Sequence, residues 1–218
     1  MGRSAFVFDA YGTLFDVHSA VRRHAALCGP DAALLSQVWR AKQLEYTWTR
    51  SLMGRHRDFA ALTAEALDFA LATVGGAKPE ARAALISAYD SLECYPEVAD
   101  VLAGLKRAGA RLAILSNGTP RMLAKAVHSA GLGGVFDDVF SVEAAGVFKT
   151  KAETYRLATE GLGMPPEAIS FQSSNRWDVA GAVAFGFRAN WINRTGQADE
   201  YFDLPPARVL PDLRGLVD

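Results

Sequence analysis

Four short apolar runs are spaced along the chain, and each one stops at small polar residues. They cover residues 5–8, 111–115, 168–171 and 187–192. An unbroken apolar run that ends in a polar turn is typical of a strand buried inside a parallel sheet. The pattern therefore predicts four parallel strands whose carboxyl ends carry polar side chains.

Helical patterns lie between these runs. Apolar residues recur at helical spacing over residues 95–108, 120–130, 152–162 and 178–185. Strand and helix thus alternate, which is typical of an α/β fold with a Rossmann-like parallel sheet and helices on both faces. Such sheets bind ligands beyond the carboxyl ends of their strands, so the polar residues there are the first candidates for a site.

The segment of residues 16–93 interrupts this alternation. It contains long helical patterns and no convincing strand, the helical patterns covering residues 34–53, 59–74 and 81–91. We expect a helical cap inserted into the α/β core, with residues 1–15 and 94–218 in the core and residues 16–93 in the cap. Because the insertion begins directly after the first predicted strand, the cap should lie over the carboxyl edge of the sheet.

The composition narrows the class of partner. The chain has 218 residues, half of them apolar, with 23 basic and 24 acidic side chains and a net charge of −1. This balance lacks the excess of basic residues that favours binding to nucleic acid or to an anionic membrane. Cys28 and Cys94 form no metal-binding or disulfide pattern, and no apolar run reaches the ~18 residues of a membrane span. We expect a cytoplasmic protein without nucleic-acid or membrane partners.

Three predicted strand ends carry side chains suited to chemistry. Asp9 follows the first run, where a plain turn-capping aspartate is the simpler interpretation. Ser116 and Asn117 follow the second run and offer hydroxyl, amide and backbone donors for an anionic oxygen. Asp178 comes soon after the third run, where it either adds a second carboxylate to the site or only meets a helix dipole. All these groups would meet a ligand at the same edge of the sheet.

In their order, these residues resemble the motifs of the haloacid dehalogenase superfamily, and within it the L-2-haloacid dehalogenases. The motifs are Asp9-x-x-x-Thr13, Ser116, Lys149 and Asp178, and the resemblance covers nearly the whole chain. A helical insertion after the first motif is also that superfamily's arrangement. The resemblance implies a haloacid dehalogenase-like core with an inserted cap.

Most members of that superfamily are magnesium-dependent phosphatases, which makes phosphatase activity the alternative function. Their D-x-D-x-T motif carries a second aspartate as general acid, where this chain has Tyr11. Their fourth motif carries acidic metal ligands, where this chain has Ser173, Ser174 and Asn175. Both differences favour halide displacement by a carboxylate, which needs neither a metal ion nor a cofactor. A non-catalytic relative kept as a binding protein is the third interpretation.

The resemblance also implies a reaction and a set of site residues. Asp9 would attack C2 of a short L-2-haloalkanoate and release halide, and Asp178, oriented with Ser173 and Asn175, would activate water to hydrolyse the Asp9 ester to a D-2-hydroxy acid. The implied catalytic residues are Asp9, Thr13, Arg40, Lys149, Tyr155, Ser173, Asn175 and Asp178. The implied substrate-binding residues are Ala10, Tyr11, Arg40, Leu44, Phe59, Ser116, Asn117 and Trp177.

Two positions bear on how far the resemblance extends. Arg40 lies in W-R-x-K-Q-L-E-Y, which is similar to the dehalogenases' cap helix, whose arginine helps to hold the leaving halide. Outside that context an arginine on an amphipathic helix is usually solvated. Thr150 stands where the family usually has proline, so the Lys149 loop is expected to be slightly less rigid. The family is often dimeric, although no segment of this chain indicates an interface.

Overall fold

A parallel sheet forms the centre of the protein. The computed structural model describes residues 4–217, and within them six strands pair in the order β3-β2-β1-β4-β5-β6. Every pairing is parallel. The order reverses at β1, so the carboxyl end of β1 is where open sheets of this kind bind ligands. The strands are β1 (Ala5–Phe8), β2 (Arg111–Ser116), β3 (Asp138–Ser141), β4 (Ile169–Ser173), β5 (Arg188–Ile192) and β6 (Arg208–Leu210).

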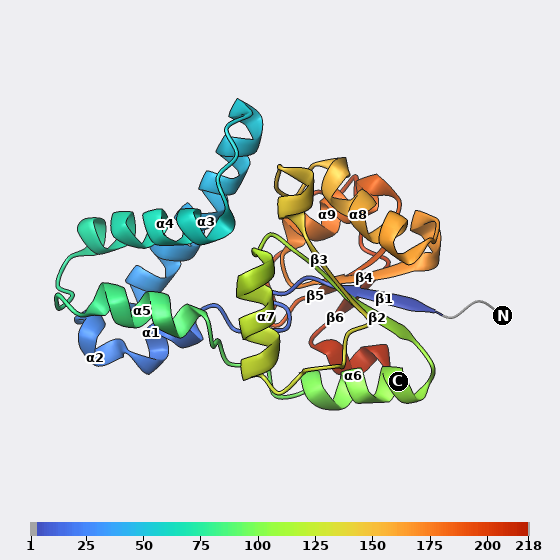
Figure 1. Ribbon diagram of the computed structural model, residues 1–218, viewed down its shortest axis with the longest axis horizontal. Coiled ribbons are helices and arrows are strands. Elements are labelled where there is room, and N and C mark those ends of the chain that lie inside the picture. Colours follow the sequence, from blue (N-terminus) through green and yellow to red (C-terminus); the bar gives the residue numbers. More distant parts are fainter. Residues whose placement is uncertain (1–3, 218) are drawn as a thin grey trace.

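Helices cover both faces of the sheet. Figure 1 shows α6 (Val98–Arg107) and α7 (Pro120–Ser129) on one side, and α8 (Ala152–Leu162) and α9 (Arg176–Phe185) on the other. This layering confirms the predicted α/β fold. Short 3-10 turns complete the described core, namely η1 (Val142–Ala145), η2 (Pro166–Ala168) and η3 (Leu213–Leu216).

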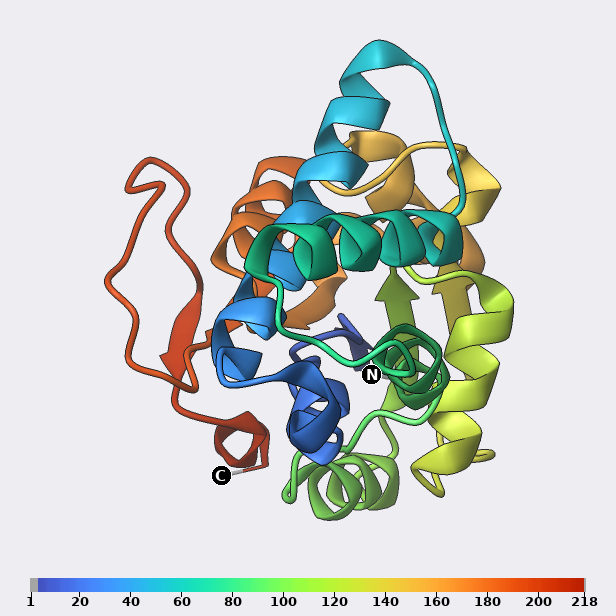
Figure 2. The same cartoon turned by 90° about the vertical axis from the view of Figure 1, so that its left-hand side faces the viewer.

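The helices between β1 and α6 form a separate layer, which we call the cap. Figure 1 places this layer beyond the end of the sheet that lies opposite the N-terminus, and Figure 2 shows α4 and α5 in front of the core when viewed from that side. The predicted cap over the carboxyl edge is therefore present. Its helices are α1 (Ser19–Arg23), α2 (Ala25–Cys28), α3 (Ala32–Met53), α4 (Phe59–Val74) and α5 (Ala81–Tyr89).

Two backbone hydrogen bonds between antiparallel segments lie where the cap joins the core. The N–H of Asp16 donates to the carbonyl of Glu93 (2.8 Å), and the N–H of Tyr95 donates to the carbonyl of Leu14 (3.0 Å). Arg22 of α1 binds the side chains of both Asp16 and Glu93, at 2.8 and 2.6 Å. We propose that the boundaries between core and cap fall here, after residues 15 and 93.

The hydrophobic pattern does not predict β3 and β6. Both are short edge strands, and their central residues, Val139 and Val209, are 45% and 54% exposed. An edge strand with one solvated face has no continuous apolar run, so it lacks the signal that marks the central strands. The short helices α1 and α2 are likewise absent from the pattern.

Local chemistry explains where two helices depart from prediction. α6 begins at Val98 rather than residue 95, because Tyr95 precedes Pro96 and a residue before proline disfavours helical backbone. α9 begins at Arg176, two residues before the predicted start, which places Asp178 in its first turn. Within residues 4–217, no helix combines the length and the apolarity that a membrane span requires.

Candidate active site

Asp9 stands at the carboxyl end of β1 with both carboxylate oxygens occupied. Its Oδ1 lies 3.1 Å from Lys149 Nζ. Its Oδ2 accepts hydrogen bonds from Asn175 Nδ2 (2.8 Å) and Thr13 Oγ1 (3.0 Å), and more weakly from Ser173 Oγ (3.5 Å). The side chain is largely buried, so these donors hold the carboxylate in one orientation.

Lys149 joins Asp9 to the second carboxylate. Its ammonium is 1% exposed and lies 2.9 Å from Asp178 Oδ2 as well as 3.1 Å from Asp9. Asp178 is fully buried, and its Oδ1 accepts a hydrogen bond from the Tyr155 hydroxyl at 2.8 Å. The motifs at the ends of distant segments therefore converge on one buried charge cluster.

This cluster carries two acidic side chains and one basic side chain, and burial together with the surplus negative charge shifts the pKa values of its members. Burial by itself lowers the pKa of Lys149, but Asp178 and Asp9 outweigh burial and raise that pKa above its usual value. Burial also raises the pKa of Asp178, with Asp9 adding to burial and Lys149 opposing it. Burial and the neighbouring Asp178 raise the pKa of Tyr155, which keeps its hydroxyl a donor.

The loop after β1 turns sharply beneath the site. The carbonyl of Ala10 accepts the N–H groups of Thr13 and Leu14, and Gly12 has a φ of +92°, which favours glycine. Within residues 4–217, the N–H groups of Ala10 and Tyr11 have no hydrogen-bond acceptor. They are thus available to bind an anionic group beside Asp9.

The turn after β2 presents the second motif. Ser116 Oγ accepts the N–H of Gly118 (3.1 Å), which leaves the Ser116 hydroxyl proton for another acceptor. Asn117 Oδ1 accepts the N–H of Lys149 (3.1 Å), so it fixes the loop that carries the lysine. A Cβ at Gly118 would lie 2.7 Å from the Tyr11 ring, so only glycine lets these two turns approach.

Arg40 reaches the site from the cap helix α3. Its Nη2 donates to the Tyr11 carbonyl (3.2 Å) and to Asn175 Oδ1 (3.3 Å). Its Nη1 donates to Gln43 Oε1 (2.8 Å). Gln43 in turn donates to Thr63 Oγ1 at 2.7 Å, so the cap aims the guanidinium at the end of β1.

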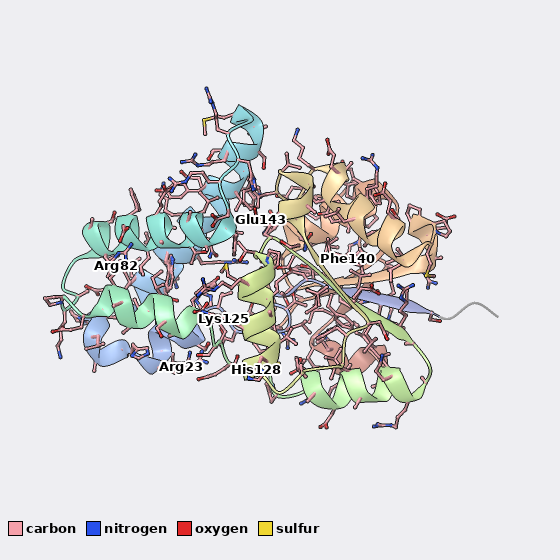
Figure 3. The ribbon with its side chains drawn as sticks, viewed as in Figure 1. Arg23, Arg82, Lys125, His128, Phe140 and Glu143 are labelled. Atoms are coloured by element: carbon pink, nitrogen blue, oxygen red, sulfur yellow. The ribbon has the colours of Figure 1, made fainter. Side chains whose placement is uncertain are left out.

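Further contacts seat the cap beside the Lys149 loop. Glu143 of η1 accepts the N–H of Phe59 (3.1 Å) and contacts His56 Nε2 (2.8 Å), and Figure 3 labels it at this junction. The N–H of Phe148 donates to Ser51 Oγ of α3 at 3.0 Å. The cap is therefore tied to the residue directly before Lys149.

A cleft of about 250 Å³ opens beside Arg40. Leu44 and Asn175 line it, and Arg194 lies at the same cleft. A larger pocket of about 400 Å³ opens at the surface of the cap beside α1, α2 and α3, but none of the predicted site residues lines it.

The four side chains predicted to line an apolar slot occupy different surroundings. Leu44 lines the cleft. Tyr11 stacks on Tyr89 (5.5 Å between ring centroids) and packs at a tilt against Phe59 (5.7 Å), and all three are buried. Trp177 meets Trp48 of the cap edge-on at 5.4 Å. A single slot shared by Leu44, Phe59, Tyr11 and Trp177 stays a prediction.

The donors around Asp9 do not suit a magnesium ion. Among residues 4–217, no three His, Cys, Asp or Glu side chains converge to hold a metal. Near Asp9 the amide nitrogen of Asn175 and the ammonium of Lys149 face the carboxylate, whereas Mg²⁺ requires several oxygen ligands. Lys149 already supplies the positive charge between the two carboxylates.

One predicted arrangement needs correction. Ser173 and Asn175 were expected to orient Asp178, but their side chains donate to Asp9. Lys149 and Tyr155 hold the Asp178 carboxylate instead. The reason is geometric: the side chain of Asn175, at the start of α9, makes no hydrogen bond to that helix and instead donates to Asp9 and to the Tyr11 carbonyl at the end of β1.

Comparison with known proteins agrees with this geometry. Residues 4–186 match the family model of the haloacid dehalogenase-like hydrolases. The chain belongs to this family. The hydrolase is 44% identical to (S)-2-haloacid dehalogenase 1 of Pseudomonas sp. strain CBS-3, over 97% of this chain and 94% of that relative.

Solved structures extend the similarity. A dehalogenase crystal structure superposes on the hydrolase with a TM-score of 0.96 and 44% identity, covering 99% of this chain and 96% of that one. The L-2-haloacid dehalogenase from Xanthobacter autotrophicus, solved with chloropropionic acid covalently bound, has a TM-score of 0.91 and 39% identity, covering 99% and 97%. These relatives favour dehalogenation over the alternative phosphatase.

Two residues of the hydrolase's site lie outside the motifs that the sequence predicts. Gln43 holds Arg40 and lies three residues after it on α3, a spacing that places two side chains on the same helix face. Arg194 follows β5 and donates to the Thr13 carbonyl at 2.9 Å. Helical spacing offers a signal for Gln43, whereas no sequence pattern indicates the contact of Arg194.

Proposed function

We propose that the protein is an (S)-2-haloacid dehalogenase that converts short L-2-haloalkanoates to D-2-hydroxy acids and halide. The observation that carries this proposal is the Asp9 carboxylate, which is held by Lys149, Asn175 and Thr13 and faced by Arg40 from the cap. Such a carboxylate is suited to attack at carbon, and a facing cation is suited to a departing anion. Position 11 holds a tyrosine, where a phosphatase has the aspartate that protonates the leaving alcohol.

The substrate's carboxylate binds at the floor of the site. Its oxygens accept hydrogen bonds from the free N–H groups of Ala10 and Tyr11 and from the hydroxyl of Ser116. This places C2 in front of Asp9 and directs the carbon–halogen bond toward the cap. Leu44, Phe59 and Trp177 surround the short alkyl chain.

In the first step, an oxygen of Asp9 displaces halide from C2. Oδ1 has one partner, Lys149, whereas Oδ2 has three donors, so Oδ1 keeps free lone pairs for the attack. The C–O bond forms as the carbon–halogen bond breaks, and the electron pair leaves with the halide. Arg40, Asn117 and the edge of the Trp177 ring receive the halide in a poorly hydrated site, where electrostatic stabilisation counts for more.

In the second step, water hydrolyses the ester at the Asp9 carboxyl carbon. Asp178 takes a proton from the attacking water, and its raised pKa suits a base of this kind. The donors Asn175, Thr13 and Ser173 stabilise the negative charge that develops on Oδ2. The alkoxide leaves with the proton from Asp178, which releases the hydroxy acid.

The two steps fix the stereochemistry. Attack from behind the carbon–halogen bond inverts C2, and hydrolysis at the carboxyl carbon of Asp9 leaves C2 untouched. An L-haloacid therefore gives a D-hydroxy acid.

The proposal is tested by incubating the protein with L-2-chloropropionate after exhaustive treatment with EDTA. Chloride release with formation of D-lactate supports the dehalogenase. Turnover of p-nitrophenyl phosphate that depends on Mg²⁺, without chloride release, would support the phosphatase instead.

Two further expectations accompany this function. The family is often dimeric, so light scattering on the purified protein tests for a homodimer. Because Cys28 and Cys94 form no disulfide pattern, a reducing compartment fits the chain best, and we expect a cytoplasmic location, which cell fractionation measures.

A further inference from the structure

Arg194 occupies the junction of three segments near the site. It follows β5, and its side chain is only 13% exposed. The guanidinium lies between the loop after β1 and the segment that returns from the cap to α6. An arginine removed from water to this extent requires partners, and the partners of Arg194 come from both neighbouring segments.

Each partner of Arg194 has a defined position. Nη1 lies 2.6 Å from Oε1 of the buried Glu97. Nη2 donates to the carbonyl of Thr13 at 2.9 Å. The guanidinium carbon lies 3.8 Å from the centre of the Tyr95 ring. The fork of donors thus fixes the Thr13 peptide relative to the start of α6.

Thr13 transmits this position to the nucleophile. Its Oγ1 donates to Asp9 Oδ2 at 3.0 Å and accepts the N–H of Ser174 at 2.8 Å. A shift of the Thr13 peptide would therefore displace a donor of Asp9 and the turn that carries Asn175. We infer that Arg194 is a positioning residue for the nucleophile, an inference that rests on the proposed function of Asp9.

Arg194 does not act on the substrate directly through its charge. Glu97 neutralises the guanidinium at 2.6 Å, and the Thr13 backbone stands between Arg194 and Asp9. Arg40 has no carboxylate partner among residues 4–217 and contacts the site itself. The two arginines thus have different roles. Arg40 faces the reacting atoms, and Arg194 holds the loop after β1 in position.

The test compares Arg194→Ala with the wild type on L-2-bromopropionate. A misplaced nucleophile slows the attack, and displacements of this kind cost about 10²-fold in rate. We expect kcat to fall about 10²-fold while KM changes little, because the groups that bind the substrate are intact. Pre-steady-state bromide release should show the same loss in the first turnover.

Chemical rescue separates positioning from a merely structural role. Arg194 lines the 250 Å³ cleft, so a small cation can reach the space that truncation leaves. Guanidinium sulfate, at concentrations that leave the wild type folded, should restore part of the kcat of Arg194→Ala, measured as D-lactate formation. Arg194→Lys should be impaired but less than Arg194→Ala, because an ammonium cannot reproduce both contacts.

Arg111 offers a matched control. It pairs with Asp138 at 2.8 Å and donates to the Leu162 carbonyl at 3.0 Å, the same kinds of contact far from Asp9. Arg111→Ala should lower the melting temperature yet keep the wild-type kcat and show no response to guanidinium.

Two outcomes would overturn the inference. One is a wild-type kcat in Arg194→Ala, and the other is an equal loss of kcat in Arg111→Ala. If Arg194→Ala does not fold, Arg194→Lys decides, since a wild-type kcat with a lower melting temperature would show a structural role only. Absence of halide release from the wild type would contradict the proposed function itself, whereas activity that survives loss of Arg194 contradicts the inference alone.

Discussion

The core and the cap contribute to the site in different ways. In the core, Asp9, Lys149 and Asp178 are buried and joined by contacts of 2.9 to 3.1 Å. From the cap, Arg40 meets the core through longer contacts of 3.2 and 3.3 Å to uncharged oxygens. The core side is preorganised, whereas the cap side offers a cation whose donors can be exchanged for an arriving anion.

This difference matches the two demands of halide displacement. A nucleophile must be oriented before the substrate binds, and the contacts of Asp9 with Lys149, Asn175 and Thr13 meet that demand. A leaving halide acquires charge only as the bond breaks. The group that binds it must therefore make only weak hydrogen bonds beforehand, which the halide can replace. Variants of the core should therefore lose the attack or the hydrolysis of the ester, whereas variants of the cap should lose the stabilisation of the departing halide.

The largest effect is expected for Asp9→Asn. Loss of the nucleophile should lower kcat by about 10⁴-fold or more, with no pre-steady-state halide release. Circular dichroism and the melting temperature check that the fold is intact, and Asp100→Asn on the exposed start of α6 is the control.

Isotope labelling sharpens the same prediction. A single turnover in H₂¹⁸O with excess enzyme should place ¹⁸O in Asp9, because water attacks the ester at the Asp9 carboxyl carbon. Label that appears mainly in the first-turnover hydroxy acid would mean that water attacks the substrate directly.

Asp178→Asn should stop the reaction after its first step. Losing a general base costs about 10²–10⁴-fold in turnover, but attack by Asp9 does not need this base. We expect about one halide per active site to be released rapidly, followed by an ester that intact-protein mass spectrometry detects. Continuous halide release without an adduct would contradict the role of Asp178.

Arg40→Ala tests the cap side. Removing one donor to a developing anion commonly costs about 10²–10³-fold in kcat, and the loss should exceed any change in KM because the charge develops in the transition state. The defect should be larger for chloride than for bromide, since chloride is the poorer leaving group. Arg40→Lys should recover little of the rate.

Arg50 on the same helix provides the control for Arg40. It lies 3.6 Å from Glu65 within the cap, so Arg50→Ala removes a cation from α3 without touching the core site. If Arg40→Ala turned over L-2-chloropropionate as fast as Arg50→Ala, another group would have to receive the halide.

The smallest effect is expected for Gln43→Leu. Gln43 donates to Thr63 and accepts from Arg40, so its loss frees the guanidinium from one aiming contact. One hydrogen bond to a charged group is worth about 1.5 kcal/mol, which corresponds to about tenfold in rate. In an Arg40→Ala background the Gln43 substitution should have no further effect on kcat. Additive losses would show that Gln43 acts apart from Arg40.

Local patterns were sufficient for the centre of the fold and for part of the site. The apolar run at Ala5–Phe8 matches β1 residue for residue, because a strand buried on both faces leaves a continuous apolar signature. Asp9 and Ser116 then follow from position alone, since parallel strands bring their carboxyl ends to the same edge. The cap follows from a long stretch that has helical periodicity and no strand.

Local patterns could not predict Lys149 as a site residue. It follows no strand directly, and only family resemblance indicated it. Its ammonium nevertheless reaches Asp9, 140 positions earlier in the chain, and Asp178, 29 positions later. Contacts of this kind depend on how segments pack, and a buried cation is retained there because two carboxylates offset its desolvation.

By itself, then, the sequence determined the parallel sheet, the inserted cap and the carboxylate of Asp9 at the end of β1, because local periodicity and strand-end chemistry encode them. Only the tertiary structure decided which carboxylate each donor serves, for Ser173 and Asn175 turn to Asp9 while Tyr155 holds Asp178. It also brought Arg194 beneath Thr13. The direction of a side chain between packed segments depends on backbone geometry and on partners distant in sequence, which no local pattern records.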